Sequence, residues 1–169
     1  MHTITARQAA IDAVVFSRQL YDVALKGFPA DKLAAQPPNL PNHALWTIGH
    51  LATTYAFFRS VLDGQSTTVP DSYNALFGPG SKPSATPSTY PPLAELIAHL
   101  NRTHAELLRV LREMPEADLT KPPAVEFPFS PTRLAAMHML AWHDGWHQGQ
   151  LSLTRVALGL PGILSNLNA

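Results

Sequence analysis

The feature that most limits how this chain can fold is a set of four long segments in which apolar residues recur at helical spacing, separated by segments rich in proline and glycine. In the third of these segments, for example, Leu93, Leu96, Leu100 and Leu107 fall on one side of a helical projection. The sequence shows no convincing strand pattern. We therefore predict an all-α protein, a four-helix bundle whose helices span about residues 5–26, 43–62, 91–113 and 131–158.

Capping residues mark several of the predicted helix ends. Asn42 is the expected N-cap of the second helix, because its side-chain oxygen can accept a hydrogen bond from a free amide of the first turn. Ser130 followed by Pro131 predicts the start of the last helix. Gly159 followed by Pro161 predicts its end.

The segment 64–90, between the second and third predicted helices, is long for a connection in a compact domain and is dense in Gly, Pro, Ser and Thr. One interpretation is a crossover that returns the chain to the other end of the bundle before the third helix. The other interpretation is a lid over a binding site. In either case Tyr73, Leu76 and Phe77 are the side chains expected to attach the segment to the core.

The composition excludes several classes of partner. The 12 basic and 12 acidic residues are scattered along the sequence, which argues against nucleic acid. No apolar run reaches the ~20 residues of a membrane span and no signal peptide is evident, so we expect a cytoplasmic protein without a membrane partner. The length fits one domain, expected to span 1–169. Because cysteine is absent, any metal must be held by histidines and carboxylates, and any thiol must come from elsewhere.

Three of the eight histidines are candidates for a metal site. His143 and His147 lie four residues apart on the last predicted helix, so their rings stand about 40° apart, one turn along the axis, and can point at one ion. His50, inside the second predicted helix, is the best candidate for a third ligand. On spacing alone, a chance pair and hydrogen-bonded core histidines are the alternatives.

Two motifs surround these histidines. His50 lies in a Trp-x-x-Gly-His-Leu segment that begins at Trp46, and a His-x-x-x-His-x-Gly-Gln segment runs from His143 to Gln150. Separated by a long linker, the two motifs resemble the DinB-like superfamily of small four-helix proteins, whose relatives include thiol-dependent transferases and isomerases. The resemblance implies that His50, His143 and His147 bind one divalent metal ion and leave coordination positions open. It also implies an up-down-down-up bundle, with a long crossover between helices 2 and 3, and a homodimer.

Four further residues are candidates for a substrate pocket beside the metal: Trp46, Trp146, Gln150 and His104. Gln150 lies three residues after His147, where it either orients a ligand or binds substrate, or else reaches solvent. The tryptophans are expected in the core or in a pocket wall. His104 lies on the apolar stripe of the third predicted helix, where a hydrogen-bonded core histidine is the main alternative.

Three imidazole ligands with open positions are typical of a catalytic metal rather than a closed structural one. Zinc, nickel and iron all accept such ligands. The ion would either activate water for hydrolysis or activate the thiol of a low-molecular-weight co-substrate for transfer to a small molecule, and the resemblance favours thiol transfer. The alternatives are a non-catalytic binding or stress-response bundle with a structural or opportunistic metal, and a metal-free bundle with buried histidines.

Overall fold

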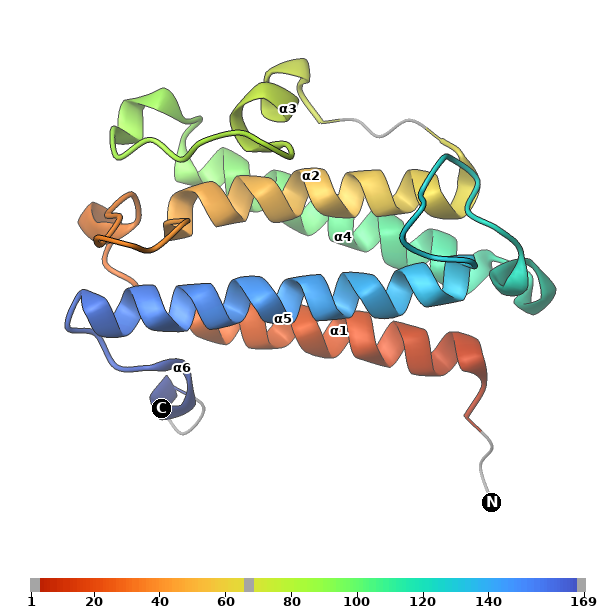
Figure 1. Cartoon of the computed structure of the whole chain (residues 1–169). Helices are drawn as coiled ribbons and strands as arrows, with labels where there is room; N and C mark the ends of the chain where they lie inside the picture. Colours follow the sequence, from red (N-terminus) through yellow and green to blue (C-terminus); the bar gives the residue numbers. More distant parts are fainter. Residues whose placement is uncertain (1–3, 66–68, 167–169) are drawn as a thin grey trace.

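The computed structural model describes residues 4–65 and 69–166, which contain helices and no strand. Four long helices form the body of the molecule (Figure 1): α1 (Ala6–Leu25), α2 (Ala44–Asp63), α4 (Leu93–Glu113) and α5 (Arg133–Ala157). The connections between them contain one short helix, α3 (Asp71–Phe77), and three 3-10 turns, at Ala30–Lys32, Pro87–Thr89 and Glu116–Thr120. A second short helix, α6 (Ile163–Asn166), follows α5. The prediction of an all-α bundle is confirmed.

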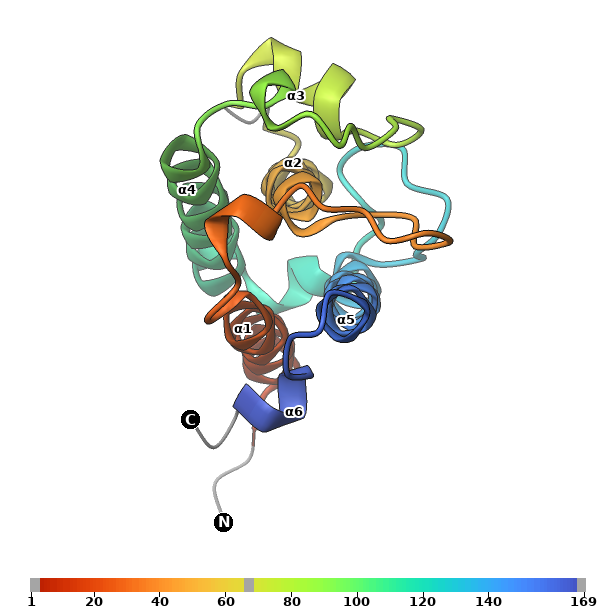
Figure 2. The same ribbon diagram turned by 90° about the vertical axis from the view of Figure 1, so that its left-hand side faces the viewer.

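The four long helices run up-down-down-up. Figure 1 shows α1 and α5 running in one direction and α2 and α4 in the other. Figure 2, which looks along the bundle, shows α2 beside α4 and α1 beside α5, and these parallel pairs make the most extensive contacts. Because α2 and α4 run parallel, the chain must return along the whole bundle between them, so the segment after α2 is the predicted crossover.

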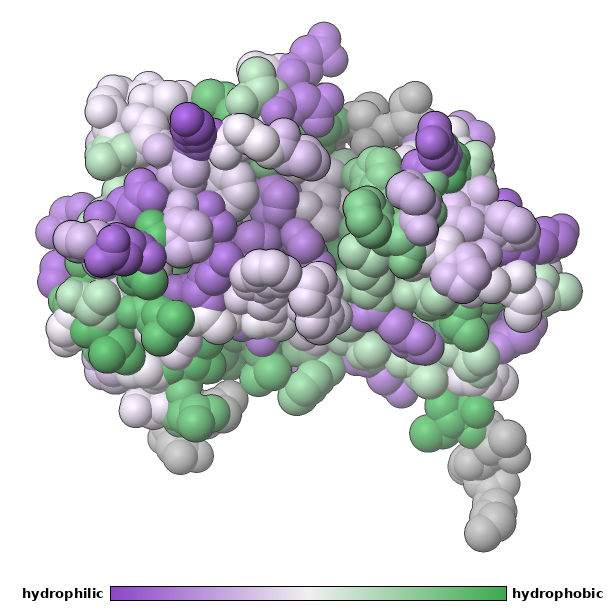
Figure 3. Space-filling model, in the orientation of Figure 1, coloured by the Kyte–Doolittle hydropathy of each residue, from purple (hydrophilic) through white to green (hydrophobic). Residues whose placement is uncertain are grey.

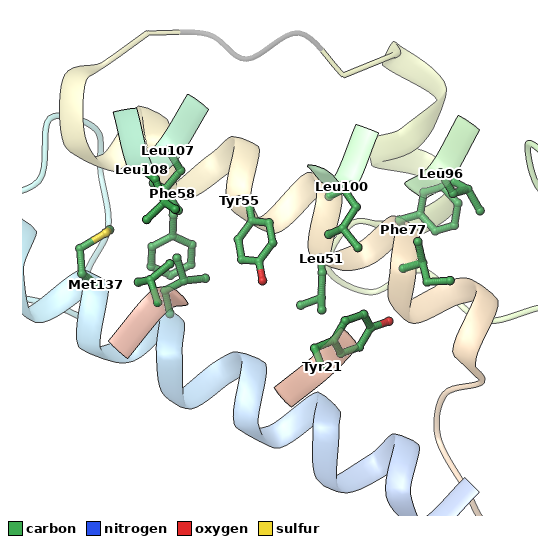
Figure 4. Packing of buried hydrophobic residues seen from close by; sticks show 14 of the residues in the cluster. Tyr21, Leu51, Tyr55, Phe58, Phe77, Leu96, Leu100, Leu107, Leu108 and Met137 are labelled. Atoms are coloured by element: carbon green, nitrogen blue, oxygen red, sulfur yellow. The ribbon is translucent and has the colours of Figure 1, made fainter. Parts of the chain in front are cut away.

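The core lies where the apolar stripes of the four long helices meet (Figure 4). Side chains from α1, α2 and α4 are completely buried there: Tyr21, Leu51, Leu100 and Leu107. Most of the circumference of α2 is buried, since α3, α4 and α5 all pack against it. Burying each large apolar side chain contributes about 1.5–3 kcal/mol, which makes this core the main source of stability.

Aromatic side chains attach the crossover to α2, as predicted. Tyr73 and Phe77 of α3 are fully buried. The ring of Phe77 lies so close to Gly49 of α2 that a Cβ atom at position 49 would overlap it. Packing therefore requires glycine at this position, and the close approach brings the backbone of Phe77 next to His50.

The start of α2 differs from the prediction. The N-cap is His43, whose Nδ1 accepts a hydrogen bond from the amide of Trp46 at 3.1 Å. Its Nε2 donates to the carbonyl oxygen of Ser84 in the crossover, at 2.9 Å. Asn42, the predicted N-cap, instead donates its side-chain amide to Gln150 on α5. The histidine ring caps the helix and binds the crossover at the same time, a combination that capping preferences alone do not indicate.

The start of α5 also lies slightly beyond the predicted Pro131. Its N-cap is Thr132, whose hydroxyl accepts a hydrogen bond from the amide of Ala135 at 3.1 Å. Ser130, the predicted N-cap, is buried beside the helix and does not cap it. The predicted end is close, because Gly159 takes the positive φ of 75° that ends many helices.

Figure 3 shows the face of the molecule that carries α5. Hydrophilic residues cover much of this face, while apolar residues gather in two places: on the right, over the loop before α5, and at the lower left, near the end of α5. None of the helices in the described ranges is both long enough and apolar enough to span a membrane.

Candidate metal centre

Three histidines converge where α2 and α5 pack together: His50 from α2, and His143 and His147 from α5. Nε2 of His143 lies 3.2 Å from Nε2 of His50 and 3.3 Å from Nε2 of His147. A metal ion bound at about 2.0–2.1 Å to tetrahedrally arranged imidazole nitrogens needs them about 3.3 Å apart. The spacing therefore fits a single ion. No second group of histidine and acidic residues converges in this way within the described ranges.

Burial keeps two of these imidazoles, those of His50 and His147, in the neutral form that a metal ion requires. Burial lowers the pKa of His50 to about 4. The same effect, reinforced by the neighbouring rings of His143 and His50, lowers the pKa of His147 to about 3. At neutral pH both rings therefore carry an unprotonated nitrogen that can bind a metal ion.

The crossover fixes the orientation of His50. Its Nδ1 lies 2.7 Å from the carbonyl oxygen of Phe77. Because a carbonyl oxygen can only accept, Nδ1 carries the proton and Nε2 keeps its lone pair. Trp46, one turn earlier on α2, stacks on the His50 ring with centroids 4.5 Å apart and planes at 11°. A hydrogen bond and a stacked ring together direct Nε2 toward the other two histidines.

Gln150 holds His147 in the same tautomer. Nδ1 of His147 lies 3.0 Å from Oε1 of Gln150, which accepts a hydrogen bond from the Nδ1 proton. The same oxygen accepts a second hydrogen bond, from Nδ2 of Asn42, at 2.9 Å. Asn42 thereby fixes the amide of Gln150, which in turn orients the ring of His147. The contact also joins the start of α2 to α5.

His143 has a different environment. Its Nδ1 is buried without a hydrogen-bond partner in the described part of the chain, and it faces Oδ1 of Asp144, 4.0 Å away, which also lacks a partner there. The other carboxylate oxygen, Oδ2, accepts a hydrogen bond from the hydroxyl of Tyr55 at 2.8 Å and lies 2.9 Å from Oγ of Ser17. A completely buried carboxylate thus lies directly behind one of the three candidate ligands.

An apolar cavity of about 290 Å³ opens beside His50 and His143, which form part of its wall. Phe57, Phe58 and Phe127 form an edge-to-face cluster in this wall, with ring centroids 5.4, 5.7 and 5.8 Å apart. None of the described residues that line the cavity is an acid, a lysine or an arginine. A molecule in this space would contact two of the three histidines and otherwise uncharged, largely aromatic surface.

The structure brings two of the four predicted pocket residues to the candidate ligands. Trp46 and Gln150 contact the ligand rings, although neither lines the cavity. Trp146 is 55% exposed, because it lies about 100° around α5 from His147 and faces solvent. His104, on α4, is largely buried and packs against Tyr55 with ring centroids 5.1 Å apart. Neither Trp146 nor His104 is brought to the cavity or to a ligand ring.

The sequence did not single out several residues that shape the site. The carbonyl of Phe77 has no sequence signature, because any residue carries one. The role of Asn42 depends on a contact with a distant helix. One sequence feature could have indicated the aromatic wall of the cavity: the pair Phe127 and Phe129 within an otherwise proline-rich segment. Asp144 had only its position beside His143.

The fold and the site together define a small helical bundle, up-down-down-up in topology, in which three converging histidines could hold one metal ion. A family model described as the DinB superfamily matches residues 13–151, which include all three histidines. The chain belongs to the DinB superfamily. No curated protein matches it. Membership of this superfamily and the geometry of the histidine cluster are both compatible with binding of a divalent metal ion.

Proposed function

We propose that this protein is a divalent-metal-dependent enzyme whose three-histidine centre acts on a small, uncharged substrate in the adjacent cavity. The observation that carries the proposal is that His50 and His143 belong both to the histidine cluster and to the cavity wall. A structural zinc site is closed by four protein ligands, whereas three converge here in the described part of the chain. The cavity is the space from which a small molecule reaches the remaining side of the cluster.

The wall of the cavity favours an apolar, preferably aromatic, substrate. Phe57, Phe58 and Phe127 offer edges and faces for aromatic contact. A charged group there would lose its hydration without gaining an ion-pair partner. Thr54 and Asn74 supply polar side chains to the wall, which can orient one polar end of the substrate. The volume of about 290 Å³ lies at the small end of ligand sites and favours a small molecule.

Of the two reactions considered, thiol transfer is favoured over hydrolysis. When bound, the metal ion supplies a Lewis acid that stabilises the anionic form of a thiol or of water. The chain contains no cysteine, so the thiol must belong to a low-molecular-weight co-substrate. The protein contributes the three imidazoles that hold the ion, the Phe77 and Gln150 contacts that orient two of them, and an apolar wall that excludes water. Exclusion of water favours a sulfur nucleophile over hydrolysis.

Elemental analysis of protein purified without a His-tag tests the metal site. We expect about one zinc, nickel or iron ion per chain, lost in His50→Ala and His147→Ala variants that keep the wild-type circular dichroism. Absence of metal from the wild type, even after reconstitution, would refute the proposal.

Activity of the metal-loaded protein is then measured with two probe reactions. One is the consumption of glutathione or free cysteine with 1-chloro-2,4-dinitrobenzene, and the other is the hydrolysis of 4-nitrophenyl acetate. If the wild type catalyses the first reaction and the His147→Ala variant does not, the result supports thiol transfer. Turnover of the second reaction alone identifies a hydrolase instead.

A non-catalytic binding bundle with a structural or opportunistic metal makes a different prediction. Neither probe would turn over, and removal of the metal would mainly lower the melting temperature, because an ion that binds only the folded state stabilises it. A Phe58→Ala change in the cavity would then weaken ligand binding without an effect on any rate.

We also propose that the protein forms a homodimer through the outer face of α5. Four large apolar side chains of α5 are each 55–61% exposed: Trp142, Trp146, Leu153 and Val156. They follow one another along the helix at intervals of four, seven and three residues. These intervals place them on one side of the helix, in a stripe about 21 Å long. Large apolar side chains gathered on an exposed face favour association with a second copy. Light scattering should give the mass of a dimer for the wild type.

A further inference from the structure

The geometry points to Asp144 as the residue that positions His143 for metal binding, an inference that rests on the three-histidine site proposed above. Nδ1 of His143 and Oδ1 of Asp144 are both buried without a partner in the described part of the chain, and they face each other at 4.0 Å. Unpaired buried polar atoms are rare and costly in folded proteins. A movement of the ring by about 1 Å brings this donor and acceptor to hydrogen-bond distance.

His143 is the ligand whose position decides the spacing of all three. Its Nε2 lies within 3.3 Å of the Nε2 atoms of both His50 and His147. Those two rings already have an acceptor for the Nδ1 proton, a carbonyl oxygen for His50 and an amide oxygen for His147. Asp144 gives His143 the same arrangement, with a charged acceptor that makes a stronger hydrogen bond and a more basic Nε2.

The carboxylate of Asp144 is held in one orientation by two other helices. The hydroxyl of Tyr55 on α2 donates to Oδ2 at 2.8 Å, and Oγ of Ser17 on α1 lies 2.9 Å from the same oxygen. The other oxygen, Oδ1, lies toward His143, 4.0 Å from Nδ1. Burying a carboxylate completely is costly unless its interactions compensate, so packing alone is a poor explanation for an aspartate at this position.

An Asp144→Asn substitution separates positioning from packing. The asparagine oxygen can accept from Tyr55 and Ser17 as Oδ2 does, which turns the NH₂ group toward His143. An NH₂ group donates, so it favours the His143 tautomer that carries its proton on Nε2, the nitrogen needed for the metal. We expect the zinc affinity to fall 10- to 100-fold while the circular dichroism stays unchanged.

Competition with a chromophoric chelator measures the zinc affinity, and the visible spectrum of the cobalt-loaded protein reports the ligand geometry. Thr103→Ala is the matched control, because it removes a buried hydroxyl from α4 that donates to the carbonyl of His99 at 3.0 Å. The control should lower stability without changing zinc affinity. An Asp144→Asn protein with wild-type affinity and the wild-type cobalt spectrum would show that Asp144 is only structural. A wild type that binds none of zinc, nickel and iron would refute the metal site itself.

Nuclear magnetic resonance of the wild type decides the question if Asp144→Asn does not fold. In a long-range ¹H–¹⁵N spectrum of the zinc-loaded protein, His143 should carry its proton on Nδ1, shifted downfield by a hydrogen bond to the carboxylate. Zinc bound through Nδ1 of His143, or an Nδ1 proton that exchanges as fast as one exposed to solvent, would overturn the inference.

Discussion

A methyl group added at Gly49 should destabilise the protein although alanine is the better helix former. The new Cβ would overlap the ring of Phe77, which is fully buried and cannot move without repacking α3 against α2. Replacing glycine by alanine inside a helix gains about 1 kcal/mol, and overpacking a core costs about 1–3 kcal/mol. An overlap with a rigid ring belongs at the upper end of that range. We therefore expect a net loss of about 2 kcal/mol, or about 4–8 °C in melting temperature for a chain of this size.

The same substitution should weaken metal binding, because displaced Phe77 no longer presents its carbonyl oxygen to Nδ1 of His50. We expect about a tenfold loss of zinc affinity. Calorimetry without metal and chelator competition measure the two effects separately. Gly145→Ala is the matched control, since that helical glycine has open space at its Cβ position, and it should stabilise the protein by up to ~1 kcal/mol with unchanged affinity. Wild-type stability and affinity in Gly49→Ala would refute the reasoning.

Four further predictions follow from the site and its surroundings. Burial, with the nearby Arg18, lowers the pKa of His104 to about 4. In the unfolded state the imidazole titrates near pH 6.5. Between about pH 6.5 and pH 4 the unfolded state therefore binds more protons than the folded state, and the free energy of unfolding falls as the pH is lowered. Urea unfolding should show that the free energy of unfolding falls by about 3 kcal/mol less in His104→Leu than in the wild type over this pH range. Gln150→Ala removes the acceptor for His147, so chelator competition should show about a tenfold loss of zinc affinity. Zinc at 100 times its Kd should raise the free energy of unfolding by about 2.7 kcal/mol in calorimetry, an effect absent from the His147→Ala variant. Trp146→Glu should give the mass of a monomer in light scattering if α5 forms the dimer interface.

Local sequence was sufficient to predict the helices and the histidine pair. An apolar stripe is a property of one segment, so the periodicity of Leu93, Leu100 and Leu107 predicts a helix without knowledge of its partners. The spacing of His143 and His147 is likewise fixed by the geometry of one helix. His50 was the best candidate for the third member of the group from its place in the second helix, and the family resemblance supported it. The distances in the structure show that the three rings meet.

Gln150, three residues after His147 on the same helix, was a predicted support of a ligand, and it does contact His147. The other supports could not be predicted, because they depend on contacts between distant segments. The acceptor for His50 comes from Phe77, 27 residues further along the chain. Asn42 had a good local reason to cap α2, but a partner on α5 holds its amide and His43 caps the helix instead. Trp146 was expected in the core or in a pocket wall, yet it faces solvent, because adjacent residues on a helix point in different directions.

The parallel pairing of α1 with α5 has a consequence for how the protein is made. Among the four long helices, α1 leaves the ribosome first and has its main partner in α5. Its apolar stripe must therefore wait until α5 has been synthesised, whereas α2 and α4 can associate earlier. Two of the three candidate ligands also lie on α5. A nascent chain that stops before this helix would leave α1 exposed to aggregation or to chaperones and would hold no metal. The metal content of a preparation would therefore report how many of its molecules have completed both synthesis and folding.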